Sequence, residues 1–107
     1  MLTGAAALPV AAVFTLTGKD YAQEDFNASW QLAYDAGLKA INSLGTLSSE
    51  DSAGGVINAE VKGAKVTIKL KDLTGGKTQI TVSARKLMLP QPEVASGVMY
   101  KIREELK

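Results

Sequence analysis

The 107-residue sequence contains neither cysteine nor histidine. Thiol nucleophiles, imidazole acid–base catalysis and zinc, copper or haem sites of the usual kind are therefore excluded, because each relies on one of these two side chains. The lack of cysteine also excludes a disulfide framework. The formal net charge is only +1, so no strong overall field attracts nucleic acid or a membrane.

The chain does contain enough apolar residues for one ordinary globular core. Apolar residues make up 46% of the sequence and charged residues 21%. A chain of this length buries roughly two-thirds of its unfolded surface, which is sufficient for a single core. We expect an apolar, alanine-rich N-terminal arm at residues 1–18 and one domain at residues 19–107.

The arm begins with an uncharged run, Leu2–Leu16, which is interrupted by Pro9. The run is shorter than the roughly 20 residues that a helix needs to cross a bilayer, and it lacks the basic start of a secretory signal. One interpretation is a loose arm, or a helical turn that packs on the domain. Another is the end of a bacterial lipoprotein signal, in which Ala5 occupies the position of the lipidated cysteine.

The next segments predict a strand followed by an amphipathic helix. The half-polar stretch Lys19–Phe26 predicts a short first strand around Tyr21–Glu24. Asn27 is a suitable N-cap, and Gly45 follows the helix where a left-handed cap is needed. Apolar or small residues recur at helical spacing between them: Trp30, Ala33, Tyr34, Gly37, Leu38, Ile41 and Leu44.

The middle of the chain changes to a period of two. Thr46–Ser52 is a weak strand candidate, and Gly54-Gly55 marks a turn. Turns at Gly63-Ala64 and at residues 73–76 separate three strands with one apolar and one polar face. The apolar positions of these strands are Ile57, Ala59, Val61, Val66, Ile68, Leu70, Ile80, Val82 and Ala84.

The C-terminal segment predicts a connector and a second helix. Two prolines in Leu87–Pro92 disfavour strand pairing, and Pro92-Glu93 suits a first helical turn. Val94, Val98, Ile102 and Leu106 form the apolar stripe of this helix. The predicted fold is an α+β two-layer sandwich in the order β-α-β-β-β-α, with a three- or four-stranded antiparallel meander and both helices on one face.

Several short motifs occur along the predicted β-α-β-β-β-α order of elements. They are the arm Gly4–Val13, Tyr21, Trp30, Ala36, Leu44-Gly45, Gly55-x-Ile57-x-Ala59, Val66-x-Ile68-x-Leu70, Thr78-x-Ile80-x-Val82 and the ending Ile102–Leu106. Together they resemble a family of small bacterial lipoproteins of unknown function (domain of unknown function 3568). Two departures are Ala5 in place of the anchor cysteine and Lys86–Pro92 in place of a glycine-rich acidic bend. The resemblance implies the periplasmic side of a bacterial membrane, a lipid-anchored native form and no catalytic residues.

Three short motifs are better explained by structure than by chemistry. Gly75–Thr78 resembles the end of a phosphate-binding loop, but a strand rather than a helix follows it. Ser83 and Lys86 match S-x-x-K, yet residues three apart on a strand point to opposite faces. Asn27-Ala28-Ser29 is formally a glycosylation sequon, for which the capping role of Asn27 is sufficient.

The acidic residues do not predict a metal site. Oxygen ligands for calcium would come from Asp20, Glu24, Asp25, Glu50 and Asp51, but their spacing does not match a dedicated loop. We expect these carboxylates to be solvated, and we expect no metal, no cofactor and no enzymatic activity.

A basic surface on the outer face of the meander is the main functional candidate. Its residues are Lys62, Lys65, Lys69, Lys71, Lys77 and Arg85. One interpretation is a solvated face whose lysines prevent edge-to-edge pairing. The other is a binding module for an anionic component of the cell envelope or an acidic envelope protein. Nucleic acid is disfavoured, because this face has no aromatic residues to stack on bases.

A second hypothesis is a carrier of a small apolar ligand or lipid, held in a groove between the sheet and the helices. The groove would be lined by Trp30, Tyr34, Met88, Met99 and Tyr100. The alternative is that these residues simply pack in the core and at the rims of the helices.

Overall fold

The computed structural model describes residues 15–16 and 21–107. The predicted anchor position Ala5 and most of the 1–18 arm lie outside these residues. The elements are β2 (Thr15–Leu16), β3 (Tyr21–Phe26), α2 (Trp30–Leu44), β4 (Thr46–Asp51), β5 (Val56–Val61), β6 (Ala64–Thr74), β7 (Lys77–Lys86), β8 (Leu89–Pro90) and α3 (Pro92–Glu105).

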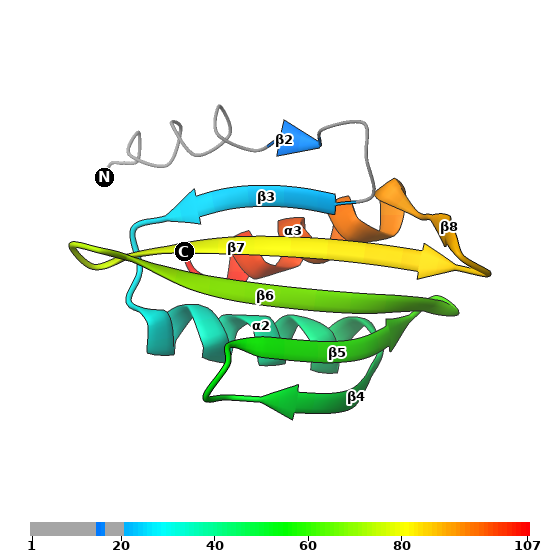
Figure 1. Ribbon diagram of the computed structural model, residues 1–107, viewed down its shortest axis with the longest axis horizontal. Helices are drawn as coiled ribbons and strands as arrows, with labels where there is room; N and C mark the ends of the chain where they lie inside the picture. The colour runs from blue at the N-terminus through cyan, green and yellow to red at the C-terminus, as the bar shows by residue number, and fades with distance from the viewer. Residues whose placement is uncertain (1–14, 17–20) are drawn as a thin grey trace.

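The strands form one antiparallel sheet in the order β2-β3-β7-β6-β5-β4 (Figure 1). Strand β8 pairs with the last residues of β7, which β3 does not reach. Strands β3 and β8 therefore lie along the same edge of β7, and β6 lies along the other. The predicted α+β class is confirmed, whereas the prediction of three or four strands was too low. Sequence patterns missed β8, and they missed the pairing of β2 with β3, which attaches two residues of the arm to the domain.

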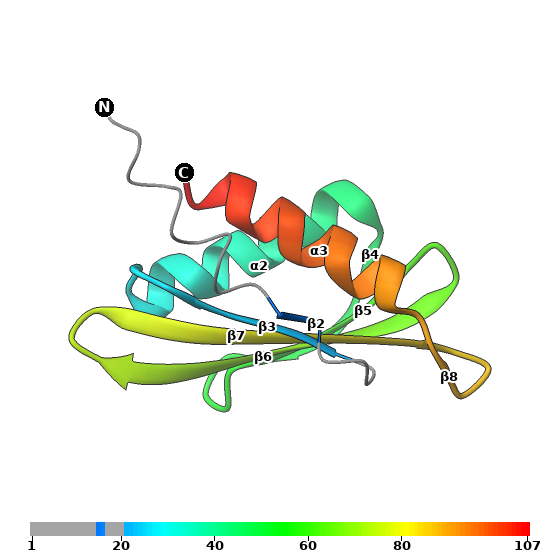
Figure 2. The same cartoon turned by 90° about the horizontal axis from the view of Figure 1, so that it is seen from above.

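Both helices lie on the same face of the sheet (Figure 2). The period-two residues of β5, β6 and β7 point toward them and form the core, as predicted; Ile57, Ile68 and Ile80 are completely buried. Helix α3 adds Val98 and Ile102 to this core. None of the described helices combines the length and the apolar character that crossing a bilayer requires.

The two ends of α2 differ from the predicted caps. Ser29, not Asn27, is the N-cap, and its Oγ accepts a hydrogen bond from the Leu32 backbone N–H at 3.3 Å. Gly45 follows the helix as predicted, but its φ of −169° is extended rather than left-handed. A glycine is needed there because a Cβ would collide with the backbone carbonyl oxygen of Glu60.

The predicted connector after β7 is instead a tight hairpin. Leu87 and Met88 form its turn, and Leu89 and Pro90 pair back with Lys86 and Arg85. The prolines were expected to prevent pairing, but β8 is short and bonded to one neighbour only, where a missing N–H is tolerated. Pro92 then begins α3 as predicted.

One carboxylate expected in solvent is buried. Glu24 lies on the helix-facing side of β3 between Ala22 and Phe26 and is 0% exposed. Its Oε1 accepts a hydrogen bond from Arg103 Nη2 at 2.9 Å, and its Oε2 lies 3.4 Å from Arg103 Nε. This ion pair joins α3 to β3, because burying a carboxylate requires a partner of opposite charge.

Candidate functional site

The face of the sheet opposite the helices, called the open face here, is ordered in rows across the strands. One row contains Glu60, Lys65 and Arg85. The next three rows are Asn58, Thr67, Ser83 and Tyr21; Val56, Lys69, Thr81 and Gln23; and Lys71, Gln79 and Asp25. Most side chains of the two middle rows therefore carry hydroxyl or amide groups, and Lys69 is the cation among them. The other cations, Lys65, Arg85 and Lys71, lie in the first and last rows.

The polar residues at the middle are hydrogen-bonded to one another. Thr67 donates to Asn58 at 3.0 Å, and Asn58 donates to Ser49 at 3.2 Å. On the other side, Gln23 donates to Thr81 at 2.9 Å. These bonds hold the side chains of neighbouring strands in place, which gives the open face an ordered polar surface.

Four of the predicted partner residues lie together on the open face. Lys65, Lys69, Lys71 and Arg85 alternate with buried residues, and all four are exposed. Lys65 stands directly opposite Arg85 across β6 and β7. Two cations in such a pair repel each other, while Glu60 on β5 lies opposite Lys65 on its other side, so the row carries one net positive charge. Lys77, also exposed, lies at the other end of the sheet, beside the β6–β7 turn.

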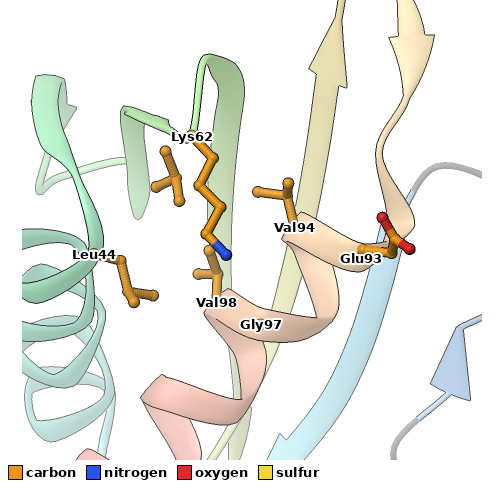
Figure 3. A pocket seen from close by; sticks show the side chains of 7 residues that line it. Leu44, Lys62, Glu93, Val94, Gly97 and Val98 are labelled. Atoms are coloured by element: carbon orange, nitrogen blue, oxygen red, sulfur yellow. The ribbon is translucent and has the colours of Figure 1, made fainter.

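Lys62, the remaining predicted partner residue, does not belong to the open face. It lies in the β5–β6 turn, and its side chain extends toward the helices, where the ammonium group lies near Val98 (Figure 3). There it lines a notch of about 60 Å³ between the C-terminus of α2 and the start of α3. This volume has room for a few water molecules only.

The five residues predicted to line an apolar groove do not all lie together. Tyr34 and Met99 are buried in the core, whereas Tyr100 is exposed on α3. Trp30 stacks on Tyr34 at 5.0 Å between ring centroids. These two aromatic residues belong to the first turns of α2, at the end of the sheet opposite the β7–β8 hairpin that carries Met88 (Figure 1). Tyr34 and Met99 thus pack in the core, as the alternative interpretation expected, whereas Met88 and Tyr100 are exposed.

Tyr34 is the side chain whose protonation the fold changes most clearly. Its hydroxyl donates a 2.6 Å hydrogen bond to Glu50 Oε1. Burial, this hydrogen bond and the negative charges of Glu50 and Asp51 raise the pKa of Tyr34 to about 12. The phenol therefore remains a neutral donor that connects α2 to the edge strand β4.

Sequence reasoning missed a depression at one end of the open face. It is lined by Glu60, Gly63, Lys65, Thr67, Ser83, Arg85, Lys86, Leu87 and Met88. Leu87 and Met88 of the β7–β8 hairpin and the cross-strand pair of Lys65 and Arg85 all line it. The missed signal was the dipeptide Leu87-Met88, which was interpreted as part of an unpaired connector.

Within residues 15–16 and 21–107, no three acidic side chains come together in a way that could hold a metal ion. No protein-family model matches the chain, and none of the curated proteins compared with it is similar enough to be a relative.

Proposed function

We propose that this protein is a non-catalytic binding domain of the bacterial cell envelope that docks an anionic partner on the open face of its sheet. The observation that carries the proposal is the cross-strand pair of Lys65 and Arg85, two exposed cations held opposite each other beside a depression. An anion between them would accept charge-assisted hydrogen bonds from both.

The polar rows beside this pair support a recognition role. Thr67 and Ser83 line the same depression as the two cations. The Ser83 hydroxyl adds a donor that is already positioned by the sheet, so little side-chain ordering is needed when a partner binds. The Thr67 hydroxyl donates its own proton to Asn58 and can only accept from a partner.

The proposed location depends on the resemblance of the sequence to small envelope lipoproteins. In that setting the native chain would be lipid-anchored, and the domain would face the periplasm. Anionic headgroups, acidic polymers and acidic protein surfaces are all candidate partners there.

Pull-down from a bacterial envelope extract tests the proposal. The baits are the wild-type chain and a variant with Lys65→Glu, Lys69→Glu and Arg85→Glu. A matched control changes three cations away from the open face, Lys39, Lys101 and Lys107, to Glu, so both variants have the same net charge. We expect the open-face variant to lose at least tenfold of the captured partner, as expected when two or three desolvated charge contacts are lost.

The wild type and the control should capture the same components, and added salt should weaken both complexes. Identical captures by the open-face variant and the wild type would refute the assignment of this face. Equal losses in both variants would also refute it, because they would indicate a response to net charge alone.

A further inference from the structure

The turn of the β7–β8 hairpin has a backbone conformation that its residues do not favour. Leu87 has a φ of 53° and Met88 a φ of 71°. Two-residue turns with both φ values positive are typically Asn-Gly or Gly-Gly, because a Cβ is strained in this region. The β5–β6 turn of the same sheet follows that rule more closely, since Gly63 occupies its second position.

This unfavourable turn also presents its apolar side chains to solvent. Leu87 is 88% exposed, Met88 82% and Leu89 63%. A leucine and a methionine at these positions therefore add little to the core and strain the backbone. Such a combination indicates selection for contact with something outside the domain.

Basic residues surround this apolar tip. Arg85 and Lys86 directly precede it, and Lys65 lies across from Arg85. The β5–β6 turn lies beside the tip, since a Cβ at Gly63 would be 3.5 Å from Lys86 Nζ. Lys62 belongs to that turn, but its side chain extends toward the helices, where it lines a notch together with Glu93, and Glu60 is an acidic residue of the depression beside the tip.

We infer that the β7–β8 hairpin inserts Leu87 and Met88 into the surface of an anionic phospholipid bilayer, while the neighbouring cations bind the headgroup phosphates. This inference deepens the proposed function and rests on it, because it identifies the anionic partner of the open face as a lipid surface. Apolar insertion combined with cationic contacts is how peripheral domains bind membranes.

The shape of the tip favours a bilayer over a protein partner. The β7–β8 hairpin projects as a narrow loop at one end of the sheet (Figure 2), and Leu87, Met88 and Leu89 in it are exposed. A protein partner would need a complementary pocket for it, whereas a fluid interface accommodates a projection of any shape. The cations flank the tip, so they would reach the level of the phosphates when the tip enters the bilayer.

Vesicle co-sedimentation of the full chain tests the inference. The vesicles contain phosphatidylglycerol and phosphatidylcholine in equal parts, with pure phosphatidylcholine as the neutral comparison. The test variant is Leu87→Asn with Met88→Gly, which removes the apolar tip and supplies the turn sequence that this backbone prefers. This variant should fold at least as well as the wild type, so a binding defect cannot be attributed to unfolding.

We expect the wild type to bind the anionic vesicles and the tip variant to bind them at least tenfold more weakly, as expected for loss of one or two buried apolar side chains. The matched control is Leu32→Asn, which removes an equally apolar side chain that is 59% exposed on α2. This control should bind like the wild type. Undiminished vesicle binding by the tip variant would overturn the inference.

The two proposals fail in different ways. The wild type could fail to bind anionic vesicles and still capture a partner through Lys65, Lys69 and Arg85. In that case the lipid inference is wrong and the proposed function stands. If vesicle binding needs Leu87 and Met88 but is unaffected by reversal of those three cations, the open face is not the binding surface. The proposed function then fails, and only the insertion of the tip remains.

Discussion

The two faces of the sheet are built from the same alternating strands, but their polar groups are used differently. On the covered face, Glu24 and Thr78 are buried, and each is held by a specific partner: Arg103 for the carboxylate and the Ala28 carbonyl oxygen for the hydroxyl. On the open face, Lys65, Lys69 and Lys71 are exposed. The comparison shows that polar groups on the covered face are buried and held by a partner from another element, whereas these lysines on the open face are in contact with solvent.

The two turns at the ends of β7 can be compared in the same way, by their backbone φ values and their side chains. The β6–β7 turn places Gly75 and Gly76 at positive φ, where glycine is unstrained, and Thr74 just before them also has a φ of 73°. The β7–β8 turn holds Leu87 and Met88 in the same region of φ. Both ends of β7 therefore lie beside non-glycine residues at positive φ, but the β6–β7 turn includes two glycines, whereas the β7–β8 turn has none and keeps two large apolar side chains in solvent.

Breaking the buried ion pair should produce the largest loss of stability. In Glu24→Gln the side chain keeps its size but loses its charge, so the partly buried Arg103 guanidinium loses its 2.9 Å ion pair with this carboxylate. We expect a loss of about 3 kcal/mol in the free energy of unfolding, measured by urea denaturation followed by circular dichroism.

Asp25→Asn is the matched control, because Asp25 is the next residue on β3 but points to the open face and accepts only a 3.2 Å bond from Gln79. It should cost less than about 1 kcal/mol. Equal losses from the two substitutions would contradict the distinction between the faces.

The sequence predicted the covered face well, because apolar alternation and helical spacing directly reflect burial. Ile57, Ile68 and Ile80 all point inward as the pattern indicates. Glu24 was misassigned to solvent, since its partner Arg103 lies 79 residues away and nothing local in the sequence reveals the pairing. Long-range pairs of this kind depend on how the helix docks, which periodicity does not determine.

The candidate site was predicted only in part for a related reason. Alternation placed Lys65, Lys69 and Lys71 correctly on the outer face, but Lys62 lies in a turn, where alternation no longer determines the direction of a side chain. The Leu87-Met88 turn was missed because its residues are atypical for the backbone that they adopt. Local rules fail where a residue serves a purpose other than folding.

The buried Tyr34 phenol should make the stability of the covered side depend on pH. Its pKa of about 12 in the folded chain exceeds the ordinary value of 10.0. The folded state therefore binds this proton more tightly, and the stabilisation is complete below pH 10 and is lost as the pH rises toward 12. We expect the wild type to lose roughly 1–3 kcal/mol more than Tyr34→Phe across this interval.

Near-ultraviolet absorbance of the folded protein gives a direct measurement. The difference between the titration curves of the wild type and Tyr34→Phe isolates ionisation of this phenol, because the other tyrosines are present in both. A midpoint near 10 in the difference curve would show that Glu50 and burial do not control this hydroxyl.

A charge reversal on the open face should change the free energy of unfolding less than the other substitutions. In Lys65→Glu, repulsion from Arg85 becomes attraction, while attraction to Glu60 on the other neighbouring strand becomes repulsion. The two changes oppose each other in solvent, so the free energy of unfolding should change by less than about 0.5 kcal/mol. In urea denaturation, neither the midpoint concentration nor the dependence of the free energy of unfolding on urea concentration should change. A loss as large as that of Glu24→Gln would mean that the open face stabilises the fold, and its cations would then need no partner to explain them.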